Sequence, residues 1–374
     1  MKVVQILPDL HGGGVERGTL EIAAGLVQAG HESIVISAGG RMVPQLEAEG
    51  SRHVMWELGR KSLLTLRHVF ALRKWLLAER PDILHLRSRL PAWVAWLAWK
   101  SLPISSRPKL VTTVHGLYSV SGYSGIMCKG ERVIAVSNTV RDYIRQNYPT
   151  TDMSKVRLVY RGIDPAEFPA GYQASEQWRE EWQKAYPQLI GKKVLTLPGR
   201  LTRLKGHHDF IQLIKHLSES GVPVCGLIVG GEDPKRQSYA TELYQRVKEE
   251  GFSDKILFTG NRSDIRDIYA VSDAVLSLST KPESFGRTVI EALSVGTPVV
   301  GYDHGGVGEM LSVYFPEGLC PMSDPNALNE RVVQVLSCQL NLDKPLPLKA
   351  DMVAQTLAVY DELLMLSDAK ANAH

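Results

Sequence analysis

The feature of this 374-residue chain that most limits its fold is a repeated alternation of short apolar segments with longer helical ones. Each apolar segment is short enough to be a buried strand. In the first half of the chain these segments are residues 2–7, 34–37, 83–86, 110–114 and 132–136. Strands that alternate with helices form a parallel sheet covered on both faces. The pattern therefore predicts an α/β fold with a doubly wound parallel sheet.

The alternation is interrupted once and then resumes. Residues 161–191 hold two X-Pro pairs and a polar helical pattern at 175–186, which we interpret as an interdomain connection. Further strand patterns follow at residues 194–197, 227–229, 256–258, 274–279 and 299–300. A chain of this length suits two domains. We therefore predict α/β domains at residues 1–165 and 166–348, followed by a C-terminal helix and tail at 349–374 that could pack on either domain.

Composition and charge exclude several classes of protein. With 44% hydrophobic and 22% charged residues, the chain is neither disordered nor collagen-like. A net charge of +3 is too small to indicate nucleic-acid binding. However, residues 1–160 carry 21 Lys and Arg against 12 Asp and Glu, which predicts an anionic partner or a merely solvated basic surface. Four widely spaced cysteines favour a reducing compartment, and the apolar N-terminus is too short for a signal peptide.

The most informative segment follows the strand pattern at 274–279. A helix is predicted to begin near Gly286 and to end at Gly296. A helix N-terminus that follows a strand offers free backbone N–H groups, which suit a phosphate. Glu291 in this helix can accept two hydrogen bonds from vicinal hydroxyls such as those of a ribose, and Glu283 can reach a second polyol. The alternative is a plain helix with a charged residue near its start.

A second loop with suitable chemistry follows the strand pattern at 194–197. Residues 199–206 combine two glycines with the cations Arg200, Arg203 and Lys205. An arginine fork and a mobile lysine are what a diphosphate requires, although a basic surface loop would look the same in isolation.

Two features of the first half point to ligand contact more weakly. Gly12, Gly13 and Gly14 would let a ligand approach the backbone, but the third glycine of a dinucleotide fingerprint is missing, which counts against a nicotinamide dehydrogenase. His115 follows a predicted strand and could contact a sugar or phosphate, although a lone histidine is more often structural. No motif predicts a catalytic metal.

Together these segments resemble family 4 of the retaining glycosyltransferases, which have the GT-B fold of two Rossmann-like domains facing a cleft. The Glu-x7-Glu signature of that family corresponds to Glu283 and Glu291, and its basic pair to Arg200 and Lys205. The glycine loop at residues 12–14 and the sugar-side His115 also match. Residues 159–164 resemble the family's Asn-Gly-Val-Asp linker, with Arg161 in place of the asparagine.

The resemblance implies a metal-independent transfer from a nucleotide sugar, with no cofactor. Cations would stabilise the charge that develops on the diphosphate leaving group. The implied catalytic residues are His115, Arg200, Lys205 and Glu283. The implied donor-binding residues are Gly12, Gly13, Gly14, Arg200, Lys205, Gly230, Arg262, Glu283, Phe285, Gly286, Arg287, Thr288 and Glu291. In this interpretation Glu283 contacts the donor sugar, Glu291 holds the ribose, and the backbone N–H groups of residues 285–288 contact the phosphates.

A narrower resemblance concerns the acceptor. Residues 82–93 resemble an Arg-Ser-Arg-x-Pro-Ala-Trp segment of some lipopolysaccharide-core glycosyltransferases, which implies that Arg87 and Arg89 bind an anionic glycolipid. Tryptophans recur at spacing three at positions 93, 96 and 99, and we favour inward packing over a membrane-facing stripe. Residues 61–80 combine basic and apolar side chains, and there we favour membrane contact over a solvated amphipathic helix.

We therefore expect a retaining glycosyltransferase that transfers a sugar from a UDP- or GDP-sugar to a lipopolysaccharide-core acceptor. The same chemistry on an exopolysaccharide, a lipid-linked or a small-molecule acceptor is the main alternative. An idle sugar-nucleotide-binding module and a two-domain oxidoreductase are further alternatives. We expect a cytoplasmic location, either free or peripheral at the inner face of the cytoplasmic membrane, and no nucleic-acid partner.

Overall fold

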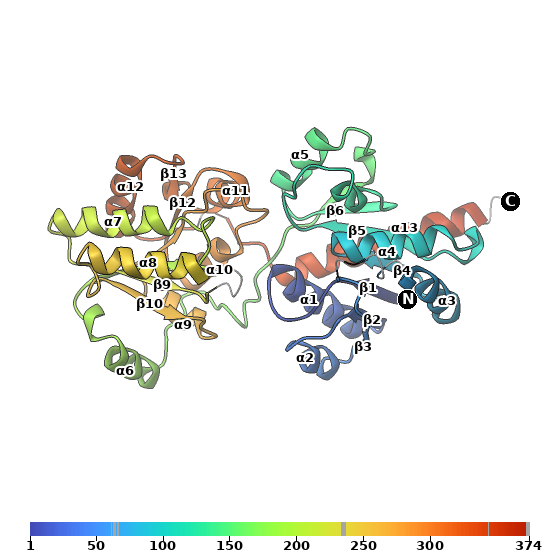
Figure 1. Cartoon of the computed structure of the whole chain (residues 1–374), viewed down its shortest axis with the longest axis horizontal. Helices are drawn as coiled ribbons and strands as arrows, with labels where there is room; N and C mark the ends of the chain where they lie inside the picture. The colour runs from blue at the N-terminus through green and yellow to red at the C-terminus, as the bar shows by residue number, and fades with distance from the viewer. Residues whose placement is uncertain (61, 63–64, 66, 233–236, 343, 372–374) are drawn as a thin grey trace. The chain divides into compact units, whose positions relative to one another are not determined.

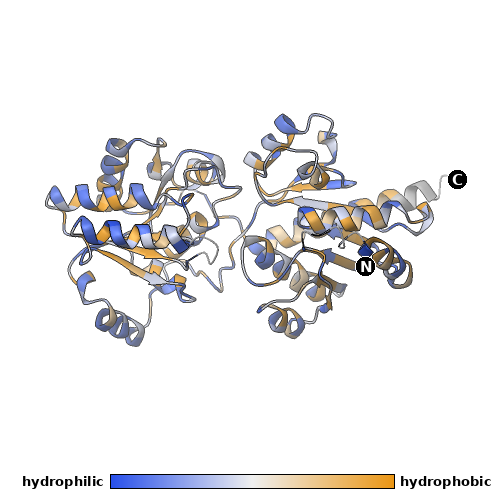
Figure 2. Ribbon diagram, in the orientation of Figure 1, coloured by the Kyte–Doolittle hydropathy of each residue, from blue (hydrophilic) through white to orange (hydrophobic). Residues whose placement is uncertain are grey.

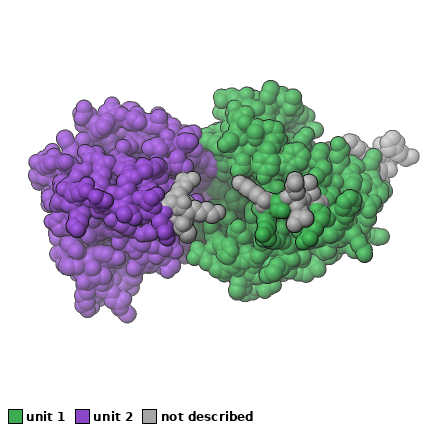
Figure 3. Space-filling view, in the orientation of Figure 1, with its two compact units in different colours: residues 1–161, 349–374 green, residues 162–348 purple. Residues whose placement is uncertain are grey.

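The computed structural model describes residues 1–60, 62, 65, 67–232, 237–342 and 344–371. The chain forms two compact units, coloured separately in Figure 3. Unit 1 contains Met1–Arg161 and the C-terminal segment that begins at Lys349, and unit 2 contains Gly162–Leu348. Each unit is built on a parallel sheet with helices on its faces, so the predicted α/β fold class is confirmed (Figure 1).

The sheet of unit 1 has seven strands in the order β3-β2-β1-β4-β5-β6-β7. The strands are β1 (Lys2–Ile6), β2 (Glu32–Ser37), β3 (Arg52–Met55), β4 (Ile83–Leu86), β5 (Lys109–Val114), β6 (Arg132–Ala135) and β7 (Val156–Leu158). The helices between them are α1 (Gly14–Gln28), α2 (Val43–Ala48), α3 (His68–Glu79), α4 (Arg89–Lys100) and α5 (Asn138–Asn147). The strand order reverses between β1 and β4, and ligands of such sheets bind at the carboxyl ends of the strands near that point.

The sheet of unit 2 has six strands in the order β10-β9-β8-β11-β12-β13. The strands are β8 (Lys193–Pro198), β9 (Val224–Val229), β10 (Ile256–Gly260), β11 (Ala274–Ser277), β12 (Val299–Tyr302) and β13 (Leu319–Cys320). The helices are α6 (Glu176–Ala185), α7 (His207–Glu219), α8 (Gln237–Glu249), α9 (Ile265–Ala270), α10 (Arg287–Val295), α11 (Gly305–Tyr314) and α12 (Pro325–Ser337). Here the order reverses between β8 and β11, the two strands that precede the predicted phosphate-binding loops.

The core of each unit lies where the apolar strand residues meet the helices. All six residues of β9 are buried, as expected for a central strand covered on both faces. Figure 2 shows the apolar residues concentrated in the strands and along one side of many helices. In unit 1, Trp93, Trp96 and Trp99 of α4 are half-buried against this core. The indole N–H groups of Trp93 and Trp99 donate to the carbonyl oxygens of Tyr123 and Pro108, which fits inward packing.

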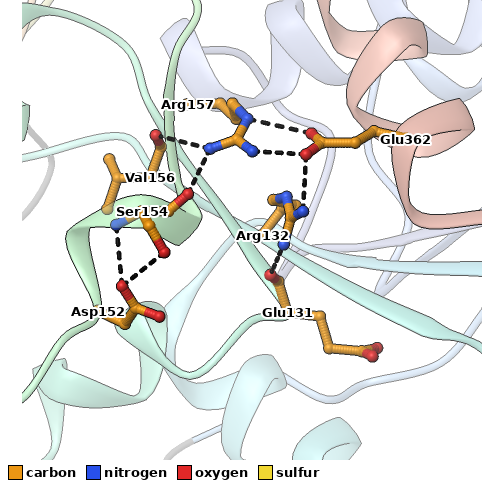
Figure 4. Close-up of polar contacts among 7 residues, drawn as sticks. All are labelled: Glu131, Arg132, Asp152, Ser154, Val156, Arg157 and Glu362. Carbon is orange, nitrogen blue, oxygen red and sulfur yellow. Dashed lines mark hydrogen bonds and ion pairs between the residues drawn. The ribbon is translucent and has the colours of Figure 1, made fainter. Parts of the chain in front are cut away.

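The last helix, α13 (Lys349–Ala371), belongs to unit 1. Its buried Met352, Val359, Tyr360 and Leu363 share an apolar cluster with residues of α1, β1, β4 and β5. On the same helix, Glu362 accepts from Arg132 of β6 at 2.7 Å and from Arg157 of β7 at 2.5 Å (Figure 4). Apolar burial and an ion-pair network therefore both hold α13 on this sheet.

Two expectations about the chain's division are corrected. Residues 161–191 are not a connection, because all but Arg161 belong to unit 2, where Trp182 and Leu189 are buried in a core cluster. The boundary lies after residue 161 rather than after 165, because Ile163 pairs with Leu348 and donates its N–H to the Pro347 carbonyl at 2.9 Å. These contacts hold the start of unit 2 against its own end.

The basic segment predicted at 61–80 is described only in part. Helix α3 begins at His68, whereas Lys61, Leu63, Leu64 and Leu66 lie outside the described residues. Among the residues that the structure describes, no helix is both long and apolar enough to cross a membrane.

Candidate active site

Two of the predicted loops meet at the carboxyl edge of the unit 2 sheet. Lys205, after β8, forms an ion pair with Glu283, after β11, with 2.7 Å between Nζ and Oε1. The Thr280 N–H donates to the Leu204 carbonyl at 2.9 Å, so the backbones of the two loops are also joined. The two motifs are 78 residues apart in the sequence but form one cluster, because β8 and β11 are neighbours in the sheet.

The Glu283 carboxylate is half-buried and strongly supported. Burial alone would raise its pKa, but Lys205 and the Ser279 hydroxyl, which donates to the same carboxylate, bring the pKa below its usual value. Glu283 is therefore an ionised hydrogen-bond acceptor at neutral pH. A carboxylate with that charge and position can accept hydrogen bonds from sugar hydroxyls.

Close backbone approach explains two of the glycines in this cluster. Gly206 caps α7 in a left-handed conformation, and a Cβ on it would lie 2.0 Å from the Leu278 carbonyl oxygen. Gly230, at the end of β9, faces the Gly199 carbonyl, and a Cβ there would also lie 2.0 Å away. Both positions hold the basic loop against the strand ends, so Gly230 has a packing role beside its predicted ligand role.

Helix α10 begins where the sequence predicts. Gly286 precedes it with φ 87° and gives its first turn no side-chain cap. The N-terminal N–H groups of such a helix favour an anion. Phe285 before the cap is buried, and Thr288 in the first turn is half-buried.

Glu291 is more enclosed than the sequence suggested. The residue is 6% exposed, and the Arg287 guanidinium donates to its Oε1 at 3.0 Å. The two side chains meet because residues four apart lie on the same face of a helix. The resemblance implied only a backbone role for Arg287, although its spacing to Glu291 indicates the pair.

A third loop, after β12, completes the cluster and was missed. The Gly306 N–H donates to the Glu283 carbonyl at 2.7 Å. The His304 Nε2 lies 2.5 Å from the Ser279 carbonyl, to which it must donate because a carbonyl can only accept. The sequence does contain a pattern that indicates this loop. The pair Gly305 and Gly306 follows the predicted strand at 299–300, just as glycines follow the other strands of the site.

The remaining predicted residues of unit 2 differ in their setting. Arg200 is exposed in the basic loop. Arg262 forms a two-bond ion pair with Asp264, with 2.6 Å between Nη2 and Oδ2, and its guanidinium lies over the Trp182 ring. Arg262 is thus held within unit 2, and its contact with the donor stays a prediction.

The predicted residues of unit 1 gather at the carboxyl edge of its sheet. Gly12 and Gly13 form the turn before α1, both with positive φ angles that favour glycine, and Gly14 opens the helix. His115 follows β5 and is buried, with its Nδ1 2.7 Å from an Arg161 guanidinium nitrogen. Burial and the nearby arginines hold the pKa of His115 well below its usual value, so the ring is neutral.

The two arginines assigned to the acceptor both have partners within unit 1, and their contact with an acceptor stays a prediction. Arg87 is only 3% exposed and donates to Gln5 Oε1 at 2.9 Å, so it is an interior residue. Arg89 is half-buried, with its guanidinium over the Tyr118 ring at 4.6 Å and a hydrogen bond to Ser124. The predicted cleft between the domains stays a prediction, since each cluster lies within its own unit.

Comparison with protein families agrees with this geometry. Residues 12–167 match the family described as Glycosyltransferase Family 4, and residues 179–353 match the one described as Glycosyl transferases group 1. The chain belongs to the family 4 glycosyltransferases. The resemblance inferred from the sequence is confirmed, and with it the assignment of this glycosyltransferase as an enzyme.

Individual relatives of this glycosyltransferase are named for diverse activities. It is 28% identical over 267 residues to the N-acetyl-alpha-D-glucosaminyl L-malate synthase of Bacillus anthracis. The aligned region covers 69% of this chain and 66% of that enzyme. It is also 28% identical over 182 residues to the lipopolysaccharide core biosynthesis mannosyltransferase LpsB of Rhizobium meliloti, covering 49% of this chain and 48% of that protein.

Solved structures confirm the GT-B fold. A glycosyltransferase from Rickettsia africae is similar with a TM-score of 0.83 and 26% identity, over 97% of this chain and 98% of that one. The Anabaena HepE structure in complex with UDP and glucose is similar with a TM-score of 0.75 and 20% identity, over 99% and 100% of the two chains.

Proposed function

We propose that this group 1 glycosyltransferase, which moves a sugar from a nucleotide sugar, binds its donor at the carboxyl edge of the unit 2 sheet. The observation that carries the proposal is the Lys205–Glu283 pair beside the uncapped N-terminus of α10. A cation, a helix N-terminus and an ionised carboxylate in one cluster match the diphosphate and the hydroxyls of such a donor. The presence of UDP and glucose in the HepE complex supports the same class of donor.

The residues of the unit 2 cluster then have defined roles. Lys205 and Arg200 stabilise the negative charge that grows on the diphosphate as the bond to the anomeric carbon breaks. Glu283 accepts hydrogen bonds from the transferred sugar, and the N–H groups at the start of α10 bind phosphate oxygens. Glu291 holds the ribose, and its hydrogen bond from Arg287 orients the carboxylate. The reaction retains the anomeric configuration and needs neither a metal ion nor a cofactor.

A binding screen tests this proposal. Calorimetry of UDP, GDP, ADP and NAD, each with and without Mg²⁺, should show that one nucleoside diphosphate binds in the absence of metal and that NAD does not. The bound base would also decide between a UDP- and a GDP-sugar. Binding of NAD alone would instead favour an oxidoreductase, and binding of no nucleotide would contradict the donor site.

For the acceptor we propose an anionic lipopolysaccharide core, with contact between unit 1 and the inner face of the membrane. The similarity to LpsB and the basic first half of the chain support this choice. Phe70 of α3 and Ile104, which follows α4, are 79% and 83% exposed. Arg73 and Lys74 follow Phe70 by three and four residues in the same helix. Exposed apolar and basic side chains together favour an anionic lipid surface.

A small-molecule acceptor is the second candidate, favoured by the similarity to the malate synthase. Release of the nucleoside diphosphate should be faster with a phosphorylated lipopolysaccharide core than with L-malate. Faster release with malate, together with failure of the protein to float with anionic vesicles, would establish the second candidate.

A further inference from the structure

Unit 1 contains a buried basic cluster that the proposed transfer reaction does not explain. It consists of His85, Arg87, His115 and Arg161, which are all 8% exposed or less. These side chains line a cavity of about 20 Å³ with Thr113 of β5 and Thr356 of α13. A cavity of that size holds one or two water-sized groups.

Two N–H groups of the cluster are buried and have no hydrogen-bond partner among the described residues. The first belongs to His115. An Arg161 nitrogen lies 2.7 Å from its Nδ1, and a guanidinium can only donate, so Nδ1 is the acceptor. The neutral ring therefore carries its proton on Nε2, which is the unpartnered atom. The second is the Arg87 Nε, whose neighbour Nη1 donates to Gln5.

The His85 ring offers no acceptor to these two N–H groups, because both of its nitrogens already have partners. The His85 ring lies between the Tyr360 hydroxyl at 2.7 Å and the Thr113 hydroxyl at 2.6 Å. Buried donors left without an acceptor are costly, so the two N–H groups require a partner that accepts hydrogen bonds.

The charge around the cavity is positive. Burial lowers the pKa of Arg87 to about 10, although Tyr360, Glu21 and Glu16 act in the opposite direction. Arg87 therefore remains charged at neutral pH, but its acidic neighbours do not offset its burial.

A second guanidinium lies close to the first. Both pack against α1 at Gly18, where a Cβ would lie 1.8 Å from Arg161 Nη1 and 3.3 Å from Arg87 Nη2. These two nitrogens are therefore no more than about 5 Å apart. Two cations at that distance in the interior repel each other, so a negatively charged acceptor near them is favoured over a neutral one.

We propose that this cavity binds one compact anion, which accepts hydrogen bonds from Arg87 Nε and His115 Nε2. A halide ion and the carboxylate end of a larger ligand share this chemistry, and both fit the small volume. A water molecule could accept the same hydrogen bonds but would not relieve the repulsion. The resemblance gave His115 and Arg87 other roles, but the test of this inference uses neither the donor nor the acceptor of the transfer reaction.

Thermal unfolding in different sodium salts tests the proposal. At constant ionic strength, bromide or formate should raise the Tm above its value in the bulkier methanesulfonate. The rise should be about 2–4 °C when the anion is about five times its Kd, as expected for a ligand that binds only the folded state. Arg87→Met should abolish this rise, whereas Arg179→Met, at an exposed position of α6, should keep it. A rise with formate but not bromide would identify a carboxylate as the ligand.

Crystals of the wild-type protein grown in bromide give a measurement that does not depend on any variant. An anomalous peak within hydrogen-bonding distance of Arg87 Nε and His115 Nε2 is expected if bromide raises the Tm, and formate density is expected there if only formate does. The proposal is wrong if neither salt raises the Tm and the site holds only water. It is also wrong if the rise persists in a folded Arg87→Met variant.

Discussion

At the scale of single residues, the Lys205–Glu283 pair is placed for chemistry more than for stability. Both side chains are partly exposed, at 31% and 26%. Ion pairs of that kind contribute about 0–1 kcal/mol to stability because solvent screens them. Their value therefore lies in placing a cation and a carboxylate together at the end of the sheet.

We predict that Lys205→Met lowers kcat by about 10²–10³-fold and weakens donor binding by less than about tenfold, because the diphosphate charge grows in the transition state. Steady-state kinetics and donor calorimetry measure the two effects. Lys193→Met is the matched control, since Lys193 forms a similar ion pair with Asp273 at the opposite end of β8 and should not affect either quantity. Equal losses in kcat and affinity would reduce Lys205 to a simple phosphate-binding residue.

At the scale of secondary-structure elements, α13 shows how a terminal helix is held in place. Glu362 bridges two arginines on neighbouring strands, which Figure 4 shows as one connected network. Their hydrogen bonds lower the pKa of Glu362 to about 2, from an ordinary value of 4.5. The carboxylate therefore stabilises the folded state above its unfolded pKa, and this contribution is lost as the pH falls from about 5 toward 2.

We predict that Glu362→Gln lowers stability at pH 7 and flattens its decline between pH 5 and pH 3. Urea unfolding at a series of pH values measures both changes. Asp361→Asn, at the adjacent exposed position, should retain the wild-type pH dependence. If the Glu362→Gln and wild-type curves ran parallel, the network would not be the source of this pH dependence.

At the scale of the whole molecule, the chain leaves unit 1 at residue 161, forms all of unit 2 and then returns to complete unit 1. The returning helix buries four large side chains, Met352, Val359, Tyr360 and Leu363, in the core of unit 1. Burying each one contributes roughly 1.5–3 kcal/mol, so their sum is comparable with the stability of a typical domain.

We predict that deletion of residues 349–374 unfolds unit 1, whereas residues 162–348 expressed alone still fold, because the apolar cluster that contains Trp182 and Leu189 is formed by residues of unit 2 alone. Circular dichroism and limited proteolysis distinguish the two parts. Met365→Ala, at a position 69% exposed on the same helix, should leave unit 1 folded. A stable unit 1 without α13 would show that the helix covers a core that is already complete.

The sequence alone was sufficient to predict the fold class and two of the three loops of the candidate site, because both depend on local patterns. Strand and helix periodicity gave the two sheets, and Gly286 and Gly296 marked both ends of α10. Only the tertiary structure decided that Lys205 meets Glu283, that Arg87 is buried, and that α13 packs on unit 1. Each of these depends on contacts between residues far apart in the chain, about which local periodicity carries no information.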